Sequence, residues 1–193
     1  MFLPAAQGVL WDGNETVPSQ WGMATFVRAG YPIIGQAQGF VHKEFSPDGY
    51  GEHPTCRNAH VVRLFDFERG WPITVAHMHG LRDLAGKMDT PERAEQAARF
   101  VRMIQSVAPS DERRIVCGDF NIEPDSQTLV MLAGIGLRDL VTGLGYTDTR
   151  TSHYKKAGRY ADYMLVSSRV NVLAFTVVEQ PEVSDHRPLL LSI

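Results

Sequence analysis

Apolar residues gather in short runs along the chain, and several of these runs end in polar clusters. The clearest pair of runs, 59–67 and 72–79, flanks a turn-forming sequence that ends at Gly70. Two such runs around a short polar turn predict a β-hairpin. On the second strand His77 and His79 lie on the same face, because side chains alternate across a strand.

Two stretches carry the spacing of a helix. Residues 90–92 read Thr-Pro-Glu, with an N-cap, a proline at the first helical position and an acid in the first turn. Apolar residues then recur at helical spacing until Pro109. A second helix is expected to begin after Asp125 or Ser126 and to end near the glycines of residues 134–136.

The remaining apolar runs are short and rich in β-forming residues, whereas the first twenty residues are rich in turn formers. Strands between helices predict an α/β or α+β sandwich in which helices cover sheet faces. A length of 193 residues favours one domain, residues 1–193. The runs expected to form strands are 23–27, 33–45, 115–117, 160–166, 170–178 and 188–193, and residues 46–55 are expected to form a loop.

Composition narrows the class of protein. A net charge of -3 argues against a strongly basic nucleic-acid coat but leaves room for a local phosphate-binding surface. No apolar run is long enough to span a membrane, and the N-terminal residues lack the pattern of a signal sequence. We therefore expect a cytoplasmic protein, unless a preceding segment carries a signal. We also expect a monomer. Cys117 is interpreted as a small buried hydrophobe rather than a nucleophile.

Polar clusters stand at the ends of the expected strands. In Gly118-Asp119-Phe120-Asn121, which follows a buried run, Asp119 and Asn121 are two apart and point the same way. A charged carboxylate beside a neutral amide suits a site that handles a water molecule and a phosphate oxygen together. Further clusters are His77 with His79, Asp162, and Asp185 with His186.

Each cluster alone has an ordinary structural explanation, such as a buried histidine, a turn-capping aspartate or a polar loop. Together they predict one site assembled from several elements. Two or three carboxylates without cysteine ligands favour Mg²⁺ or Mn²⁺, and zinc is the lesser alternative. A metal, a histidine and a water-orienting carboxylate suit phosphate ester hydrolysis. Neither Gly-x-Ser-x-Gly nor a Walker-type loop occurs, which disfavours serine hydrolases and nucleoside triphosphatases.

Three motifs together resemble the endonuclease/exonuclease/phosphatase (EEP) superfamily. They are Gly118–Asn121, Asp162-Tyr163, and the sequence Ser-Asp-His-Arg-Pro-Leu at residues 184–189. The superfamily includes apurinic endonucleases, pancreatic-type deoxyribonucleases, sphingomyelinases and inositol-polyphosphate phosphatases. The resemblance extends over residues 23–193 and implies a four-layer α/β/β/α sandwich.

The resemblance also implies roles for the matching residues. Asp119 would orient or deprotonate the attacking water, and Asn121 would hydrogen-bond the phosphate. His186 would stabilise the pentacovalent phosphorus or transfer a proton, with Asp162 orienting its ring. Asp185 would help to bind the metal.

Other residues are assigned with less support from the motifs. The strand histidine of the superfamily falls at His77 or His79, and a place nearer the strand end favours His79. The basic segment 150–159 precedes Asp162 and would contact substrate through Arg150, Lys155 and Arg159, although a solvated basic loop would look the same. The segment Gly80 to Asp89 would form another wall of the cleft.

The first third of the superfamily pattern is missing. It normally contains a strand ending in Gln-Glu, whose glutamate is a principal metal ligand, and no Gln-Glu dipeptide occurs here. We therefore expect an N-terminally truncated EEP domain that binds Mg²⁺ weakly, or a natural protein that has lost the segment. An exposed sheet edge and a less stable fold would follow.

These inferences predict a metal-dependent phosphodiesterase that acts on a phosphate ester, most simply as a nuclease on nucleic acid. Two alternatives remain open. One is a phosphomonoesterase or phospholipid hydrolase of the same superfamily, and the other is a catalytically inactive fragment.

Overall fold

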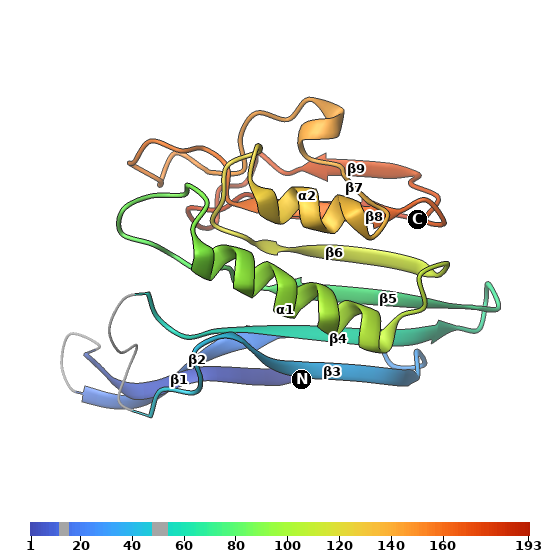
Figure 1. Ribbon diagram of the computed structural model, residues 1–193, viewed down its shortest axis with the longest axis horizontal. Coiled ribbons are helices and arrows are strands. Elements are labelled where there is room, and N and C mark those ends of the chain that lie inside the picture. Colours follow the sequence, from blue (N-terminus) through green and yellow to red (C-terminus); the bar gives the residue numbers. More distant parts are fainter. Residues whose placement is uncertain (12–15, 48–53) are drawn as a thin grey trace.

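The computed structural model describes residues 1–11, 16–47 and 54–193 (Figure 1). This part of the chain forms strands, two α-helices and one short 3-10 helix. The elements are β1 Phe2–Trp11, β2 Thr16–Ala24, β3 Ile33–His42, β4 Arg57–Asp66, β5 Trp71–Met78, α1 Pro91–Val107, β6 Arg113–Asp119, α2 Gln127–Gly134, β7 Leu137–Asp139, η1 Thr142–Leu144, β8 Asp162–Ser167, β9 Ala174–Val177 and β10 Leu189–Ser192.

A six-stranded mixed sheet in the order β3-β4-β5-β6-β8-β7 forms the centre of the fold. Only β5 and β6 pair in parallel among its strands, and α1 makes the crossover between them. Both α-helices lie on the same face of this sheet (Figure 1). The parallel pair brings the ends of β5 and β6 to one edge, where Asp162 at the start of antiparallel β8 lies opposite Asp119.

Helix α1 begins as its sequence predicts. The Thr90 side chain accepts a hydrogen bond from the backbone N–H of Arg93 at 3.2 Å, and Pro91 occupies the first turn. Such an N-cap contributes about 1 kcal/mol. The buried face of the helix includes Phe100, whose ring meets the Phe120 ring edge-on with centroids 6.3 Å apart. Phe120 in turn stacks on Tyr163 of β8, so the helix, β6 and β8 share one apolar core beneath the sheet edge.

Two glycines allow the ends of β5 and β6 to touch backbone to backbone. A Cβ atom added at Gly118 would lie 2.2 Å from the carbonyl oxygen of Met78, and one added at Gly80 would lie 2.2 Å from that of Phe120. Gly118 also has a φ of 136°, which side-chain-bearing residues rarely adopt. The Gly80 N–H donates to the carbonyl oxygen of Asp119 at 2.6 Å, so the two strand ends are joined directly.

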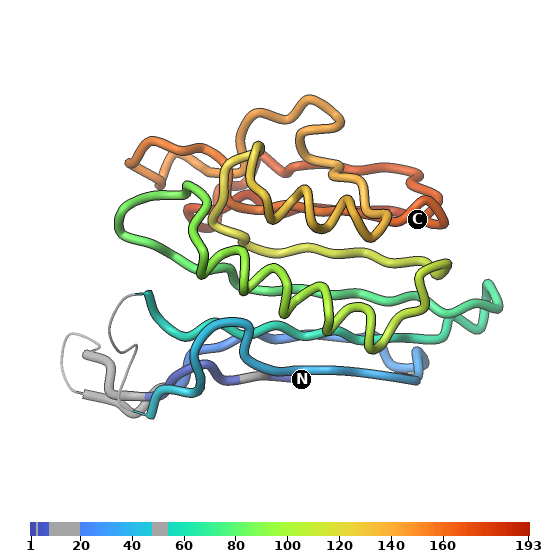
Figure 2. Tube along the Cα trace, viewed as in Figure 1, coloured from blue at the N-terminus to red at the C-terminus, as the bar shows by residue number. Residues whose placement is uncertain are grey.

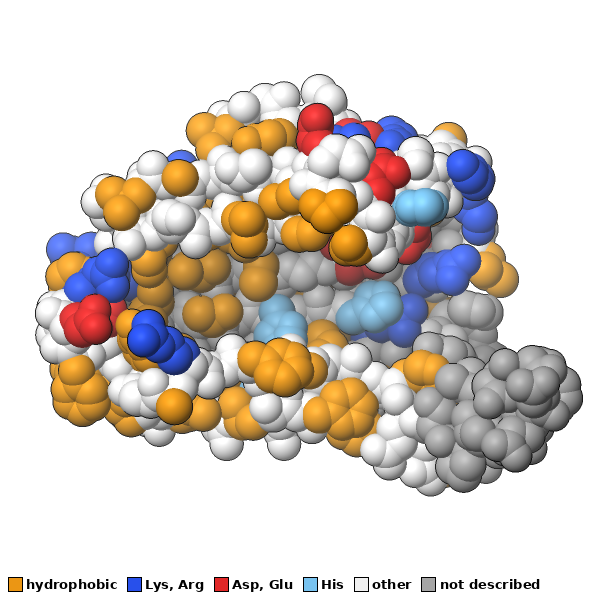
Figure 3. Space-filling model, turned by 180° about the vertical axis from the view of Figure 1, so that it is seen from behind, with side chains coloured by type: hydrophobic (Ala, Val, Ile, Leu, Met, Phe, Trp, Pro, Cys, Tyr) orange, Lys and Arg blue, Asp and Glu red, His pale blue; other side chains and the backbone are white. Residues whose placement is uncertain are grey.

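Two smaller antiparallel sheets, β1-β2 and β9-β10, lie outside the central sheet. Seen from the side opposite the helices, the molecule is hollowed, and apolar side chains and histidines show at the bottom of the hollow (Figure 3). Val75, His77 and Cys117 on β5 and β6 are each only partly buried on this side of the sheet. The face that carries the helices, by contrast, holds fully buried residues such as Ala76 and Val116.

Several sequence predictions are confirmed. The mixed α/β fold is present, the expected hairpin is β4-β5, and the helix after Thr90 is α1. Ser126 rather than Asp125 caps α2, because the Ser126 hydroxyl accepts from the N–H of Thr128. The four-layer arrangement, the single domain over residues 1–193 and its N-terminal truncation stay predictions.

Other predictions are wrong. The turn-rich first twenty residues form most of the β1-β2 hairpin, and the strand expected at 23–27 begins earlier, at Thr16, and ends at Ala24. Pairing between the two strands outweighs their local turn preference. Most of the loop expected at 46–55 lies outside the described residues. The three-residue strand β7 was not predicted, because so short a run carries no pattern. No helix in the described chain has the length and apolar character to cross a membrane.

The glycine contact leads to a stability prediction. Gly118→Ala should lower the free energy of unfolding by roughly 2–4 kcal/mol, because the methyl group would collide with a backbone oxygen at a strained φ. Gly143→Ala is the matched control, since nothing lies within 4 Å of a Cβ added there. Urea unfolding of both variants measures the difference, and equal stability would contradict the contact.

Candidate active site

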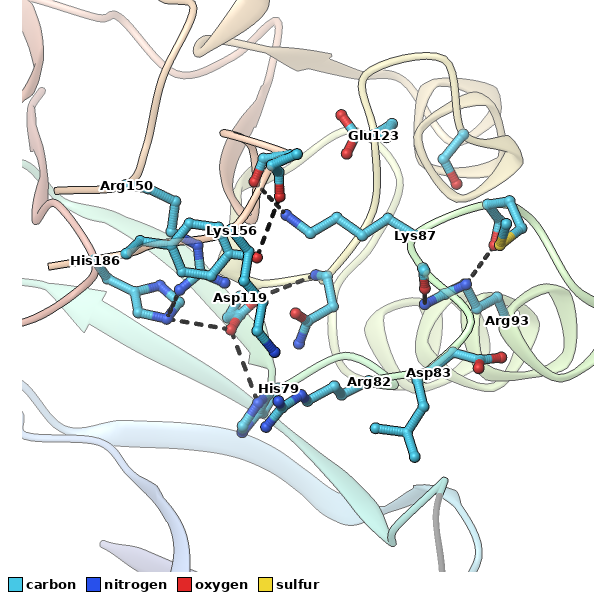
Figure 4. Close-up of a pocket in the computed structure, with 18 of the residues that line it drawn as sticks. His79, Arg82, Asp83, Lys87, Arg93, Asp119, Glu123, Arg150, Lys156 and His186 are labelled. Atoms are coloured by element: carbon cyan, nitrogen blue, oxygen red, sulfur yellow. Dashed lines mark hydrogen bonds and ion pairs between the residues drawn. The ribbon is translucent and has the colours of Figure 1, made fainter. Parts of the chain in front are cut away.

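Four of the predicted residues meet at the edge where β5, β6 and β8 end or begin, and Figure 4 labels three of them, His79, Asp119 and His186. His79 follows β5, Asp119 ends β6, Asp162 opens β8, and His186 lies just before β10. The Nε2 atoms of His79 and His186 lie 3.8 Å and 3.7 Å from Asp119 Oδ2. The carboxylate of Asp119 is therefore flanked by two imidazoles.

The ring of His186 is oriented by Asp162. His186 Nδ1 donates to Asp162 Oδ2 at 2.8 Å, which turns Nε2 toward Asp119. Thr149 holds the aspartate in place, because its hydroxyl accepts from the N–H groups of Ala161 and Asp162. Burial lowers the pKa of His186, but the hydrogen bond and charge of Asp162 outweigh it and leave the pKa above its ordinary value.

The pKa of Asp119 is suitable for a general base. Burial and the nearby charge of Asp162 raise its pKa to about 6, although His186 and Arg150 oppose the rise. A carboxyl group whose pKa approaches neutrality holds a proton more firmly than an ordinary aspartate and still loses it at physiological pH. Such a group can accept a proton from a water molecule.

Asn121 stands beside this carboxylate in an uncommon backbone conformation. Its φ is 54°, in the left-handed region that asparagine tolerates better than most residues. Its N–H donates to Asp119 Oδ1 at 3.0 Å, and its side-chain amide donates to the carbonyl oxygen of Gly80 at 3.3 Å. The amide therefore lines the pocket at a fixed place beside Asp119.

The structure separates the two strand histidines. His79 lines the pocket, and burial together with the charges of Arg57 and other cations lowers its pKa to about 4, so its ring is neutral at pH 7. His77 instead contacts the hydroxyl of Thr25 at 2.7 Å, and that hydroxyl also contacts His60 at 2.8 Å. His77 thus belongs to a separate cluster and is not among the residues that line the pocket.

The residues present fit a divalent cation. One ligand atom from each of Asp119, Asp162 and His186 lies within 4.8 Å of the others, and this is the only such group in the described part of the chain. Burial and, after it, the nearby charge of Asp162 raise the pKa of Asp119, and a hard cation would balance the charge of these two carboxylates. Asp185, the predicted ligand, lies beside this group, with Oδ2 3.9 Å from His186 Nε2, and is paired with Arg150 at 3.0 Å.

A cavity of about 1240 Å³ opens over these residues. The segments 80–89 and 150–159 form two of its walls and lie at the same end of the molecule (Figure 2). Arg150 and Lys155, which are expected to contact substrate, line the cavity. Arg159 does not line it, because its guanidinium turns to Asp148, with Nε 2.9 Å from Oδ2.

Sequence reasoning missed two residues of the cavity. Lys87 reaches across from one wall to the other, where its ammonium donates to the carbonyl oxygens of Gly158, at 3.1 Å, and Tyr160 (Figure 4). Arg57 on β4 donates to the carbonyl oxygen of Gly80 at 2.8 Å. Segment 80–89 was expected as a wall, but no local pattern distinguishes Lys87 or Arg57 from other basic residues.

The sequence profile of the Endonuclease/Exonuclease/phosphatase family matches residues 6–186. The chain belongs to this family. Its members cleave phosphate esters and generally depend on a divalent metal, so the chain is a phosphoesterase of the Endonuclease/Exonuclease/phosphatase family. No curated protein matches the sequence.

Solved structures share the fold at low sequence identity. An endonuclease/exonuclease/phosphatase from Bacteroides vulgatus is 16% identical with a TM-score of 0.66, and the match covers 99% of this chain and 74% of that one. The Bacteroides thetaiotaomicron mannosyl-6-phosphatase Bt3783 is 17% identical with a TM-score of 0.60, over 84% and 67%. D. rerio TDP2 complexed with single strand DNA product is 15% identical with a TM-score of 0.53, over 83% and 67%.

The pair of Asp162 and His186 leads to a prediction for titration. Asp162→Asn should lower the pKa of His186 below its ordinary value, because burial would then act without the opposing charge. NMR titration of the imidazole signals measures the shift. Asp111→Asn, an exposed site, is the control. An unchanged His186 titration in Asp162→Asn would show that the pair does not form in solution.

The bridge made by Lys87 leads to a second prediction. Lys87→Met removes two hydrogen bonds to backbone carbonyls, so amide exchange in residues 150–160 should accelerate about tenfold, equivalent to about 1.4 kcal/mol. Lys156→Met changes a lysine of the wall 150–159 that makes no such bonds, and it should leave exchange unchanged. Hydrogen exchange measured by mass spectrometry compares the two, and similar rates would argue against the bridge.

Proposed function

We propose that this chain is a metal-dependent phosphodiesterase that acts on nucleic acid. The proposal rests on the convergence of Asp119 and His186 in the cavity, with Asp162 hydrogen-bonded to the ring of His186. Asp119, with its raised pKa, orients the attacking water and accepts its proton. Asp185 together with the neighbouring carboxylates would hold a divalent cation, Mg²⁺ or Mn²⁺, which would supply charge neutralisation for the phosphate.

Three side chains are proposed to hold the phosphate. The neutral ring of His79 and the amide of Asn121 donate to its non-bridging oxygens without a change of charge. His186, whose ring Asp162 orients through Nδ1, stabilises the pentacovalent phosphorus through Nε2. The two imidazoles on either side of Asp119 have different environments, because the pKa of His79 is lowered and that of His186 is raised.

The cavity supports an extended substrate. A volume of about 1240 Å³ exceeds the 300–1,000 Å³ common for small-ligand pockets. Basic residues on both walls, Arg82 on one and Lys155 and Lys156 on the other, suit a phosphate backbone. The similar fold of TDP2, solved with a single strand DNA product, is consistent with this class of substrate.

A phosphomonoesterase is the second candidate. Acidic residues also line the cavity, among them Asp83, Glu123 and Asp125, and they would repel a long polyanion. The mannosyl-6-phosphatase with the same fold is consistent with this alternative. Rates on plasmid DNA, an abasic duplex, bis(p-nitrophenyl) phosphate and p-nitrophenyl phosphate, each with Mg²⁺ and with chelator, distinguish the two.

Variants at the proposed base and acid test the mechanism. Asp119→Asn and His186→Ala should each lower kcat/KM by about 10²–10⁴, because each removes a group that acts on the reacting atoms. Asp111→Asn should retain activity. In the wild type, kcat/KM should rise as pH passes about 6, where Asp119 loses its proton, and fall above the raised pKa of His186. Reproducible activity that neither variant changes would refute the assignment.

A further inference from the structure

The predicted metal ligand Asp185 is already paired with a cation of the protein itself. Arg150 Nη1 lies 3.0 Å from Asp185 Oδ2, and the same nitrogen contacts His186 Nε2. The Arg150 side chain is 5% exposed, whereas that of Asp185 is 49% exposed. A buried guanidinium therefore holds a half-exposed carboxylate beside His186.

The backbone prevents the two residues from drifting apart. The N–H of Thr151 donates to the carbonyl oxygen of Asp185 at 3.2 Å, and the N–H of Arg187 donates to that of Thr149 at 2.9 Å. Residues 149–151 and 185–187 are thus joined side by side. Only a rotation of the side chains can separate the guanidinium from the carboxylate.

Arg150 has donors left for a second partner. Its Nε is buried and has no hydrogen-bond partner in the described part of the chain, and Asp185 and His186 are both engaged through Nη1. Its guanidinium lies 4.4 Å from the centre of the Tyr154 ring, which supports it from one side. Arg150 also lines the cavity, and a guanidinium with free N–H groups is suited to bind two oxygens of a phosphate.

The charges oppose simultaneous binding of Asp185 to two cations. A divalent cation on Asp185 would lie close to the guanidinium of Arg150, and the two positive groups would repel each other while they compete for the same carboxylate. A phosphate supplies the missing negative charge and gives Arg150 a new partner.

We propose that Arg150 couples phosphate binding to metal binding. Without substrate, the ion pair between Arg150 and Asp185 lowers the affinity of Asp185 for a divalent cation. A phosphate group in the cavity draws the guanidinium away and frees the carboxylate for the cation. The inference rests on the proposed function, in which Asp185 is a metal ligand and the substrate is a phosphate ester. Because linkage is reciprocal, the cation must strengthen phosphate binding by the same factor.

Mn²⁺ affinity, followed by the electron paramagnetic resonance signal of free Mn²⁺, tests the coupling. Methylphosphonate serves as a phosphate mimic that cannot be hydrolysed, and a protein-free titration corrects for Mn²⁺ bound to it. Saturating methylphosphonate should tighten Mn²⁺ binding to the wild type about tenfold. Arg150→Gln should bind Mn²⁺ about tenfold more tightly without methylphosphonate and gain nothing further when it is added. Asp185→Asn should bind Mn²⁺ weakly in both conditions.

Two further variants sharpen the comparison. Arg150→Lys keeps a positive charge beside Asp185 and should leave Mn²⁺ affinity without methylphosphonate close to that of the wild type. Arg169→Gln removes an exposed arginine outside the cavity and should behave as the wild type in every titration. If Arg150→Gln does not fold, as judged by circular dichroism, the wild-type and Arg150→Lys titrations decide the question.

The failures of the two proposals are distinguishable. Wild-type Mn²⁺ affinity that methylphosphonate leaves unchanged, or weaker Mn²⁺ binding by Arg150→Gln, would overturn the coupling even if metal-dependent hydrolysis is observed. Absence of any phosphate ester hydrolysis by the wild type would refute the proposed function instead.

Discussion

The contact between the ends of β5 and β6 is the constraint on which the site depends. Because Gly80 and Gly118 carry no side chain, the two backbones meet at van der Waals distance and share a hydrogen bond at Asp119. That contact brings His79 within 3.8 Å of Asp119. Antiparallel pairing with β8 then sets Asp162 opposite Asp119, so backbone geometry defines the site before any side chain is considered.

The polar groups at this edge can lie close together because acidic side chains are placed beside basic ones. Burial and the nearby charge of Asp162 raise the pKa of Asp119, and the ring of His186 lies against both carboxylates. Arg150 adds a positive charge beside Asp185. Each ligand that enters the site must therefore displace or recruit one of these charges.

Local sequence patterns were sufficient to predict the elements that have strong periodicity or a capping residue. The β4-β5 hairpin and the start of α1 at Thr90 follow from neighbouring residues alone. The β1-β2 hairpin was missed because its stability comes from cross-strand pairing, which the turn-forming residues in the same segment conceal. β7 was missed because three residues are too few for a pattern.

The chemical groups of the site can be identified from the order of residues alone, because the motifs show which carboxylates, amides and imidazoles stand at strand ends. The partners of these groups follow from the folded chain. It separated His79 from His77, turned Arg159 toward Asp148, and paired Arg150 with Asp185. The reason is physical: a motif specifies residue types over a few positions, whereas a distance between side chains depends on strand pairing and loop packing across the whole chain.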